Sequence, residues 1–273
     1  MRAWIEGAKR RIRRHVGARR LFGLKARLRG LRPVGPLPDF IIIGTQKGGT
    51  TALFEMLAQH PGVSPSLVKE VHYFDINYHR GEHWYRRHFP LTESGVSGEA
   101  SPYYLFHPAV PDRLRALVPK ARLIVILRDP VERALSHYFH SRRRGYETLP
   151  MLEAFEAEEA RLAGQEAKLG APDGVSYAHQ HHSYVARSRY MEQLERWKGF
   201  DLLVISNSQL RSEADETFAR VCRFIGVEPI PAPALIRPLG GEKAEVDPEA
   251  RRYLQQQLAG ETEAVEAAWG LRL

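Results

Sequence analysis

The stretch GTQKGGTT, residues 44–51, follows directly on the apolar run DFIII. Gly44 and Gly49 have the spacing of a phosphate-binding loop, G-x-x-x-x-G-K-[ST], and Thr51 occupies its hydroxyl position. The preceding residue, where an NTPase carries its lysine, is a threonine, and Lys47 lies inside the loop instead. Glycines let backbone N–H groups turn toward a phosphate, and the following helix adds the positive end of its dipole. The stretch therefore predicts a strand–loop–helix unit that binds a phosphate compound without the NTPase arrangement of Lys and Mg²⁺. A glycine-rich turn that binds nothing is the alternative.

Three short apolar runs set the expected fold, and they occupy residues 39–44, 122–128 and 201–206. A helical pattern follows each run: about 50–59 after the first, from Pro130 after the second, and up to Ile225 after the third. Further helices are expected at 150–168, 184–198 and 248–268. Uninterrupted apolar strands that alternate with helices are typical of a parallel sheet covered on both faces. The sequence predicts an α/β fold: a P-loop-like, three-layer α/β/α domain with a central parallel sheet.

The positive charge of the chain is concentrated at its N-terminal end. Residues 1–32 hold 12 of the 40 Lys and Arg and one of the 32 acids, so this arm carries +11 and the other 241 residues carry −3. Apolar residues recur in the arm at helical spacing, which is typical of a basic amphipathic helix on an anionic membrane surface or against a partner. A solvated arm is the equal alternative. RPVGPLP, residues 32–38, breaks any helix, so we expect an arm and linker over 1–38 and one domain over 39–273.

Composition favours a reducing, cytoplasmic location, peripheral to a membrane if the arm binds one. Cys222 is the only cysteine, and its apolar neighbours predict a buried small residue. We find no run long and apolar enough to cross a bilayer, and no segment laid out as a secretory signal. We expect no nucleic acid as a partner.

A second motif, LRDPVERALSHY, follows the second apolar run at residues 127–138. The carboxyl ends of parallel strands meet at the edge of the sheet where ligands collect. Arg128 ends the run and Ser136 lies two turns into the next helix, so the pair is suited to binding a second, separate phosphate. The run Arg142–Arg144 further along this helix is interpreted as a solvated face rather than a substrate contact.

Four motifs occur in register, and together they carry a family resemblance: IIIGTQKGGTTAL, KEVHYFD, GEASPYYL and LRDPVERALSHYFH. Over residues 39–270 the chain resembles the sulfotransferases that use 3′-phosphoadenosine-5′-phosphosulfate (PAPS), most of all a bacterial-like member of the heparan sulfate type. The resemblance implies PAPS as co-substrate, with no metal needed because PAPS supplies its own leaving group. It assigns the 5′-phosphosulfate to Lys47, Gly48, Gly49, Thr50 and Thr51, and the 3′-phosphate to Arg128 and Ser136.

The resemblance also implies the chemistry: transfer of a sulfuryl group to a hydroxyl, or an amine, of a carbohydrate or glycolipid acceptor. Lys47 would stabilise the charge on the bridging oxygen of the leaving group. Glu70 of KEVHYFD would act as general base, with His72 as the second candidate and Lys69 shaping the acceptor site. The structural alternative for Glu70 is a surface carboxylate paired with Lys69, and Asp75 is expected to be structural.

Several positions depart from the family pattern or point elsewhere. Ala100 replaces a lysine that is usual in the heparan sulfate enzymes, which favours a different carbohydrate or a glycolipid as acceptor. Lys243 in LGGEKAEVDP is a weak candidate for a lysine of the loop that closes over the nucleotide. Trp84 and Tyr103 are expected in the core rather than on a sugar. HQHH, residues 179–182, is interpreted as a histidine-rich loop rather than a metal site.

Two other functions compete with this interpretation. A P-loop kinase or NTPase is disfavoured by Thr50 and by the lack of a clear Mg²⁺-binding acid at a strand end. A non-enzymatic anion-binding or membrane-surface protein with a vestigial nucleotide site is the other alternative.

Overall fold

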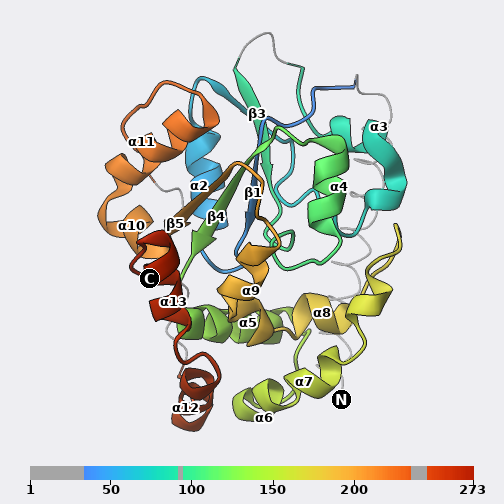
Figure 1. Ribbon diagram of the computed structural model, residues 1–273, viewed down its shortest axis with the longest axis vertical. Coiled ribbons are helices and arrows are strands. Elements are labelled where there is room, and N and C mark those ends of the chain that lie inside the picture. The colour runs from blue at the N-terminus through green and yellow to red at the C-terminus, as the bar shows by residue number, and fades with distance from the viewer. Residues whose placement is uncertain (1–33, 92–94, 235–244) are drawn as a thin grey trace, which may run out of the picture.

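The structure is a computed structural model that describes residues 34–91, 95–234 and 245–273. Its centre is a five-stranded parallel sheet with strand order β2-β3-β1-β4-β5 (Figure 1). The strands are β1 (Phe40–Gly44), β2 (Val63–Pro65), β3 (Val96–Ala100), β4 (Arg122–Leu127) and β5 (Leu202–Ser206). The predicted α/β fold with a parallel sheet is thereby confirmed, and the three apolar runs form β1, β4 and β5.

The two faces of the sheet build two separate cores because successive side chains of a strand point to opposite faces. Ile41, Leu123 and Val204 belong to one core, and Ile42, Ile124 and Ile205 belong to the other. The second face packs on α2 (Thr50–Leu57), α10 (Asn207–Ser212) and α11 (Ala214–Ile225). The first face packs on α3 (Gly81–Arg86), α4 (Val110–Leu117), α9 (Tyr190–Glu195) and α13 (Glu261–Trp269).

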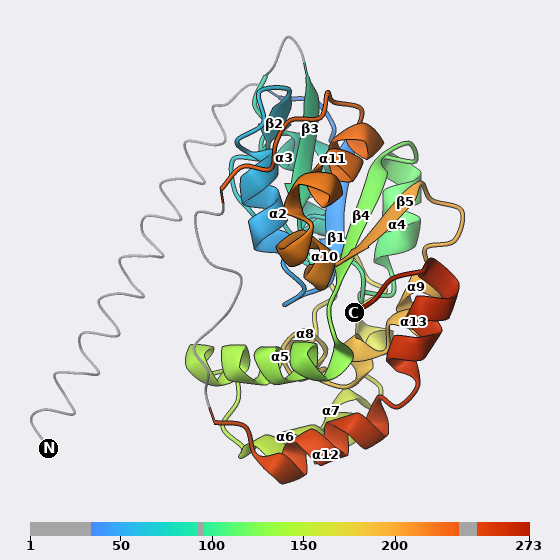
Figure 2. The same ribbon diagram turned by 90° about the vertical axis from the view of Figure 1, so that its left-hand side faces the viewer.

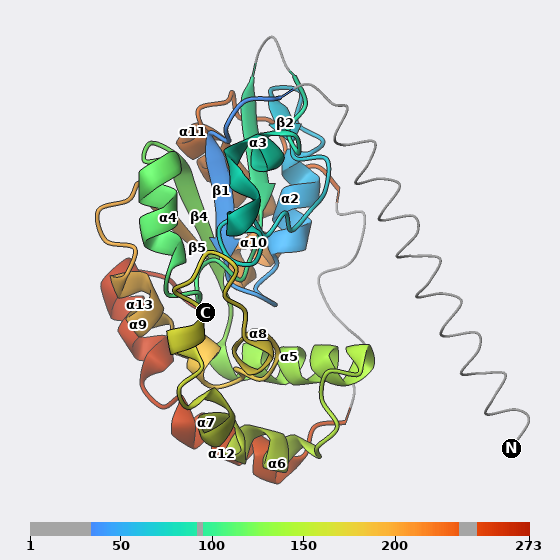
Figure 3. The same cartoon turned by 90° about the vertical axis from the view of Figure 1, so that its right-hand side faces the viewer.

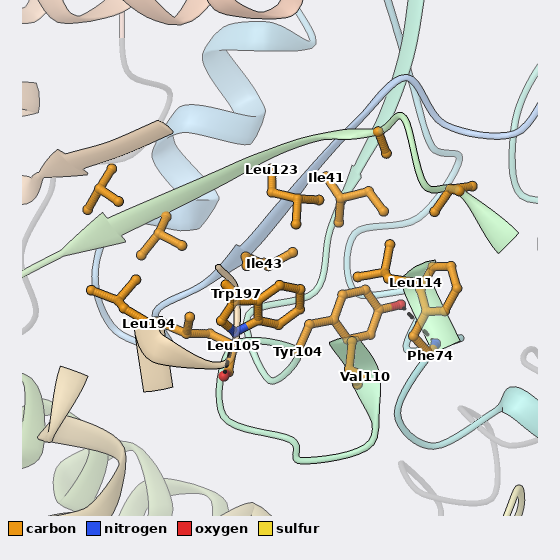
Figure 4. Close-up of a cluster of buried hydrophobic side chains, with 14 of the residues drawn as sticks. Ile41, Ile43, Phe74, Tyr104, Leu105, Val110, Leu114, Leu123, Leu194 and Trp197 are labelled. Atoms are coloured by element: carbon orange, nitrogen blue, oxygen red, sulfur yellow. Dashed lines mark hydrogen bonds between the residues drawn. The ribbon is translucent and has the colours of Figure 1, made fainter. Parts of the chain in front are cut away.

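The first core is rich in aromatic side chains whose polar atoms are satisfied. The indole of Trp197 is buried and donates to the Leu105 carbonyl at 3.2 Å (Figure 4). The Tyr104 hydroxyl accepts from the Tyr73 N–H at 2.8 Å and from the Phe74 N–H at 3.3 Å. A buried polar group without a partner costs free energy, so these bonds allow large amphipathic rings in the core.

A further group of helices covers neither face of the sheet and lies beyond the carboxyl ends of the strands. Figures 2 and 3 show α5 (Pro130–Arg144) crossing beneath the sheet, with α6 (Met151–Glu156), α7 (Glu158–Leu162) and α12 (Pro248–Gln257) further out and α8 (Tyr177–His181) beside α5. A small core of its own, which includes Leu135, Phe155 and Leu254, joins α5, α6 and α12. The site is therefore bounded by the sheet edge above and by α5 below.

Some predicted helices are wrong in their extent. The expected helix 150–168 is divided into α6, α7 and a 3₁₀ turn at Glu166–Lys168, and 184–198 contains only a 3₁₀ turn at Ala186–Ser188 and α9. The expected helix 248–268 is interrupted before α13 by Gly260, whose φ of 80° is left-handed. A left-handed residue ends helical hydrogen bonding, and glycine adopts this conformation at low cost.

The basic arm, residues 1–32, lies outside the described residues. Residues 34–38 of the predicted linker lie against the body: the Gly35 N–H donates to the Arg86 carbonyl at 3.2 Å, and Arg86 Nε donates to the Gly35 carbonyl at 2.7 Å. Across the described ranges, every helix falls short of the length and apolarity that a bilayer crossing requires.

Candidate active site

One cavity of about 1100 Å³ lies at the carboxyl edge of the sheet, between the loop after β1 and helix α5. Eight of the ten predicted site residues line it: Lys47, Gly49, Thr50, Thr51, Glu70, His72, Arg128 and Ser136. Gly48 does not line it, and Lys243 lies outside the described residues. The structure thus brings the two proposed anion sites and the proposed base together, although their roles remain predictions.

The loop after β1 is shaped by close backbone contacts. The Gly48 N–H donates to the Thr45 carbonyl at 2.9 Å, and a Cβ at Gly48 would lie 2.3 Å from the Ile126 carbonyl oxygen of β4. Glycine is required there by packing, and its N–H is already used within the loop. Gly49 precedes α2 with a left-handed φ of 116°. The first turn of α2 lines the cavity, and the N–H groups at a helix start have no intrahelical partner. These amides are suited to an anion.

Lys47 lies in the same loop and holds a left-handed backbone, with a φ of 73°. Burial lowers its pKa to about 8, and the positive charges of Arg143 and Arg128 act in the same direction. In such surroundings the protonated form of a lysine is destabilised, and an anion placed beside it stabilises that form. The cavity therefore favours a negatively charged ligand at this point.

The backbone of the KEVHYFD segment is strained at the residues that line the cavity. Glu70 and His72 are also left-handed, with φ values of 63° and 54°. Non-glycine residues rarely adopt this conformation, and such strain clusters at functional sites. Hydrogen bonds at the end of β3 hold it: the Glu70 N–H donates to the Ala100 carbonyl at 2.9 Å, and the His72 N–H donates to Ser101 Oγ at 3.1 Å.

Basic and acidic side chains alternate in a series of contacts along this segment. Lys69 Nζ lies 2.6 Å from Glu70 Oε1, His72 Nε2 lies 3.4 Å from Glu70 Oε2, and His72 Nδ1 lies 2.7 Å from Asp75 Oδ2. The Asp75 side chain is fully buried, whereas that of Glu70 is 45% exposed and so can be reached by a ligand. Asp75 therefore holds the imidazole in place, as its predicted structural role requires.

These contacts set the protonation states. Burial alone would raise the pKa of Glu70, but the hydrogen bond from His72 and the charge of Lys69 lower it to about 2. Burial alone would lower the pKa of His72, but the adjacent Asp75 and Glu70 raise it to about 10. At neutral pH Glu70 is ionised and His72 carries protons on both nitrogens. A doubly protonated imidazole cannot accept a proton, so the geometry favours Glu70 over His72 as the base.

A buried carboxylate holds the KEVHYFD segment in place through intervening hydrogen bonds. Glu99 of β3 accepts hydrogen bonds from the hydroxyls of Tyr85 at 2.7 Å, Tyr104 at 3.0 Å and Ser101 at 2.7 Å. Because Ser101 and Tyr104 in turn accept N–H groups of the KEVHYFD segment, Glu99 fixes the backbone that presents Glu70. Glu99 belongs to the GEASPYYL motif, but the motif alone predicted no role for it.

Helix α5 carries the second predicted anion site. The Asp129 side chain caps its start by accepting the Glu132 N–H at 2.8 Å, Pro130 occupies its first turn, and Gly145 ends it with a φ of 75°. Arg128 and Ser136 face the cavity, joined by Arg251 of α12. Glu132 lies 3.7 Å from Arg128 and 2.8 Å from Arg251 and balances part of this charge.

Sequence reasoning missed several residues that line the cavity, among them His140, Arg187, Tyr146 and Arg251. His140 follows Ser136 by one helical turn, a spacing that could have identified it. Burial and the nearby Lys47 lower its pKa to about 4, so it is neutral at pH 7. Arg187 is buried between the rings of Tyr103 and Phe106, and it donates to the Gln46 side chain of the loop and to the His179 carbonyl. Arg187 belongs to no motif that would have identified it as a site residue from the sequence.

The remaining sequence candidates lie as follows. Trp84 stacks on Tyr73 and does not line the cavity. Tyr103 is buried, as expected, but it also lines the cavity, and its hydroxyl lies 2.7 Å from His179 Nδ1. Ala100 has no exposed surface and belongs to the core on the α2 side. Cys222 is buried, as expected. Within residues 34–91, 95–234 and 245–273 there is no group of three or more potential metal ligands.

Comparison with known proteins shows which family and which relatives this chain is similar to. Residues 37–234 match the model of the sulfotransferase domain family. The chain is 37% identical over 206 residues, 71% of its length, to the human bifunctional heparan sulfate N-deacetylase/N-sulfotransferase 3, and the match covers 23% of that protein. It is 35% identical over 199 residues to the mouse heparan sulfate glucosamine 3-O-sulfotransferase 3B1, covering 71% of this chain and 47% of the relative. The chain therefore spans about a quarter to a half of the length of these relatives.

A solved structure supports the same grouping. The crystal structure of a sulfotransferase from Alicyclobacillus acidocaldarius superposes with a TM-score of 0.71 at 27% identity. The superposition covers 87% of this chain and 98% of that one. The common fold therefore extends beyond the segment that the family model matches.

Proposed function

Because this chain belongs to the sulfotransferase family, we propose that it transfers a sulfuryl group from PAPS to a hydroxyl, or an amine, of a carbohydrate or glycolipid acceptor. The observation that carries the proposal is the convergence of Lys47, Glu70 and Arg128 on one cavity. A nucleotide with a phosphate at each end of its ribose needs two separate anion sites, and a transfer reaction needs a base near one of them.

Two groups of residues that line the cavity would bind the two phosphate groups of the nucleotide. Lys47 and the first-turn amides of α2 would bind the 5′-phosphosulfate, and Arg128 with Ser136 would bind the 3′-phosphate. Arg251, which shares Glu132 with Arg128, adds positive charge beside Arg128. These sites hold the reacting sulfur at a fixed distance from the loop, which lowers the entropic cost of the transfer.

Glu70 would act on the acceptor. As the acceptor oxygen forms its bond to sulfur, the bond from sulfur to the bridging phosphate oxygen breaks, and the electron pair leaves with the phosphate. Lys47 stabilises the charge that develops on this bridging oxygen. Bond formation makes the acceptor hydroxyl strongly acidic, so its proton passes to Glu70 even though the pKa of this carboxylate is only about 2.

His72 and Lys69 would keep Glu70 ionised and oriented. With Nδ1 on Asp75 and Nε2 facing Glu70, the imidazolium fixes one carboxylate oxygen, and Lys69 fixes the other. We assign His72 a positioning role because it has no free lone pair while its pKa is near 10. The departure at Ala100 is consistent with an acceptor other than heparan sulfate.

The basic arm supports a separate proposal: residues 1–32 bind an anionic membrane surface, and the enzyme is cytoplasmic and peripheral to that membrane. The support is the +11 charge and the helical spacing of its apolar residues. Deletion of residues 1–32 should abolish binding to vesicles that contain phosphatidylserine and leave sulfuryl transfer unchanged. Unaltered vesicle binding would refute this role.

The experiment for the main proposal is incubation of the protein with ³⁵S-labelled PAPS and a carbohydrate and lipid extract, followed by identification of the labelled product. Glu70→Gln should lower turnover by about 10²–10⁴-fold, the range for removal of a general base. Its affinity for adenosine 3′,5′-bisphosphate should stay within about twofold of wild type. Full activity in Glu70→Gln would exclude the assigned base.

A further inference from the structure

The loop after β1 is tied to its neighbours by main-chain hydrogen bonds on either side of its middle. Before the middle, the Thr45 N–H donates to a carbonyl of β4 at 3.0 Å, and after it, Asn207 Nδ2 donates to the Gly48 carbonyl at 2.7 Å. Within the described ranges, no hydrogen bond reaches the main chain of Gln46 or Lys47, which lie between these two points. The lysine assigned to the leaving group therefore lies in the part of the loop that its own backbone does not hold.

A side chain from a distant segment holds the middle of the loop instead. Arg187, in the 3₁₀ turn Ala186–Ser188, donates from Nη1 to Oε1 of Gln46. A guanidinium group has donors only, so the oxygen of the Gln46 amide faces it and the amide nitrogen faces away. Gln46 lines the cavity, and in the part of the chain that the structure describes this nitrogen has no hydrogen-bond partner. The contact thus fixes both the position of the loop and the orientation of an amide at the cavity.

Arg187 is itself held in place on two sides. Its Nη2 donates to the carbonyls of His179 and Gln180 in α8, at 2.9 and 3.1 Å. Its guanidinium carbon lies 4.9 Å from the centre of the Tyr103 ring and 5.0 Å from that of the Phe106 ring. Ring faces attract a guanidinium group, and the carbonyls fix its plane. The group that contacts the loop is therefore rigid.

The charge of Arg187 is costly to the fold. The side chain is 1% exposed and forms no ion pair with any acid that the structure describes, and its Nε is buried without a hydrogen-bond partner. Burial lowers the pKa of Arg187 to about 9. A buried charge without an opposite charge destabilises the native state. Sequences break such rules at functional sites, and an anion bound in the cavity that Arg187 lines would offset part of the cost.

We propose that Arg187 is a positioning residue for the loop that binds the 5′-phosphosulfate. It acts through Gln46: by holding this side chain, it keeps Gln46 and Lys47 in their binding conformation before the nucleotide arrives. A site that is ordered in advance binds its ligand at a lower cost in entropy. The inference rests on the proposed function and deepens it, because it adds to the loop a residue that lies 141 positions further along the chain.

The test is calorimetric titration of the intact protein with adenosine 3′,5′-bisphosphate and with adenosine 3′-monophosphate, which lacks the 5′ group. Arg187→Met should weaken binding of the bisphosphate by about tenfold, because the middle of the loop must then be ordered when the ligand binds. The affinity for the 3′-monophosphate should stay unchanged. Equal losses for the two nucleotides, or no loss for the bisphosphate, would overturn the inference.

A double variant tests whether Arg187 acts through Gln46. Residues that work as one unit have non-additive effects, so Gln46→Met/Arg187→Met should bind the bisphosphate no more weakly than the weaker single variant. Losses that multiply would contradict the assigned route.

Arg113→Met is the matched control. The guanidinium of Arg113 is also buried, donates to the Phe74 carbonyl at 2.8 Å and lies 4.7 Å from the Tyr78 ring, but Arg113 does not line the cavity. This variant should lower Tm and leave the ratio of the two nucleotide affinities unchanged. A ratio that changes as much as in Arg187→Met would assign the effect to lost stability and contradict the positioning role.

Amide hydrogen exchange of the free protein, followed by NMR, requires neither the Arg187 variant to fold nor a nucleotide to bind. The Gly48 amide, which is hydrogen-bonded within the loop, should exchange faster in Gln46→Met than in wild type because the loop opens more often. An unchanged exchange rate would show that the contact with Arg187 does not hold the loop. Failure of the bisphosphate to bind the wild-type protein contradicts the proposed function instead, so the two failures are distinguishable.

Discussion

Lys47 and Glu70 face one cavity from two different loops, and both hold a left-handed backbone, with φ values of 73° and 63°. The two residues to which the chemistry is assigned are therefore also two of the three non-glycine residues with positive φ among those described. Side chains are kept at these positions at a cost in backbone energy, which is the pattern expected where function rather than stability selects the residue.

This strain can be measured by comparing glycine and alanine variants. Lys47→Gly should be more stable than Lys47→Ala by about 1 kcal/mol, because alanine pays the left-handed penalty and glycine does not. For a domain of this size the difference amounts to roughly 2–4 °C in Tm. Ser136 in the middle of α5 is the control of opposite sign, since glycine there should be the less stable by about 1 kcal/mol. Equal Tm values for the two Lys47 variants would show that the backbone is unstrained.

The pH dependence of catalysis should report Lys47. Its pKa is lowered to about 8, so the cation is lost as pH rises through this value, and kcat/KM should fall on the alkaline side with an apparent pKa near 8. Bound nucleotide raises the pKa of Lys47, so the corresponding limb of kcat should shift to higher pH. Lys47→Arg should remove the alkaline limb because arginine stays charged. An alkaline limb that persists in this variant would assign it to another group.

The pairing of His72 with Asp75 should appear in the pH dependence of stability. The folded pKa of His72 is raised from 6.5 to about 10, so its contribution is fully present below pH 6.5 and is lost as pH rises toward 10. The difference in unfolding free energy between wild type and His72→Gln should therefore be largest near pH 6 and shrink by pH 10. Parallel stability curves over this window would contradict the charge assignment.

The second anion site should discriminate nucleotides by their 3′-phosphate. Arg128→Ala should weaken binding of adenosine 3′,5′-bisphosphate by about 10–100-fold, the range for loss of a charge-assisted hydrogen bond of roughly 1.5–3 kcal/mol. Affinity for adenosine 5′-monophosphate should stay unchanged because this nucleotide lacks the 3′-phosphate. Arg115→Ala on α4, an exposed arginine paired with Asp112, serves as control. Equal losses for both nucleotides would place Arg128 elsewhere on the ligand.

Local sequence patterns predicted only part of the fold. β1, β4 and β5 are fully or largely apolar and could be found, whereas β3 contains Ser97, Gly98 and Glu99 and lacks any such run. Gly98 is needed because a Cβ there would lie 2.2 Å from the Phe40 ring, a contact that only the folded sheet creates. β2 has three residues and no periodicity to detect.

The site residues that belong to a sequence motif could be predicted. The glycine loop, Arg128 and Ser136 lie in the cavity, as spacing and the family resemblance implied. Arg187 and Tyr146 come from segments whose approach to the cavity depends on the packing of α8 against α5, which local sequence does not encode. The raised pKa of His72 likewise depends on three-dimensional contacts with Asp75 and Glu70.

The most direct measurement of the central claim is the thermal shift produced by two nucleotides at equal concentration. A ligand that binds only the native state raises the free energy of unfolding by RT ln(1 + [L]/Kd). If Lys47 and Arg128 bind the two phosphate ends of one nucleotide, adenosine 3′,5′-bisphosphate should raise Tm far more than ATP with Mg²⁺. A larger shift with ATP and Mg²⁺, or none with the bisphosphate, would contradict the account.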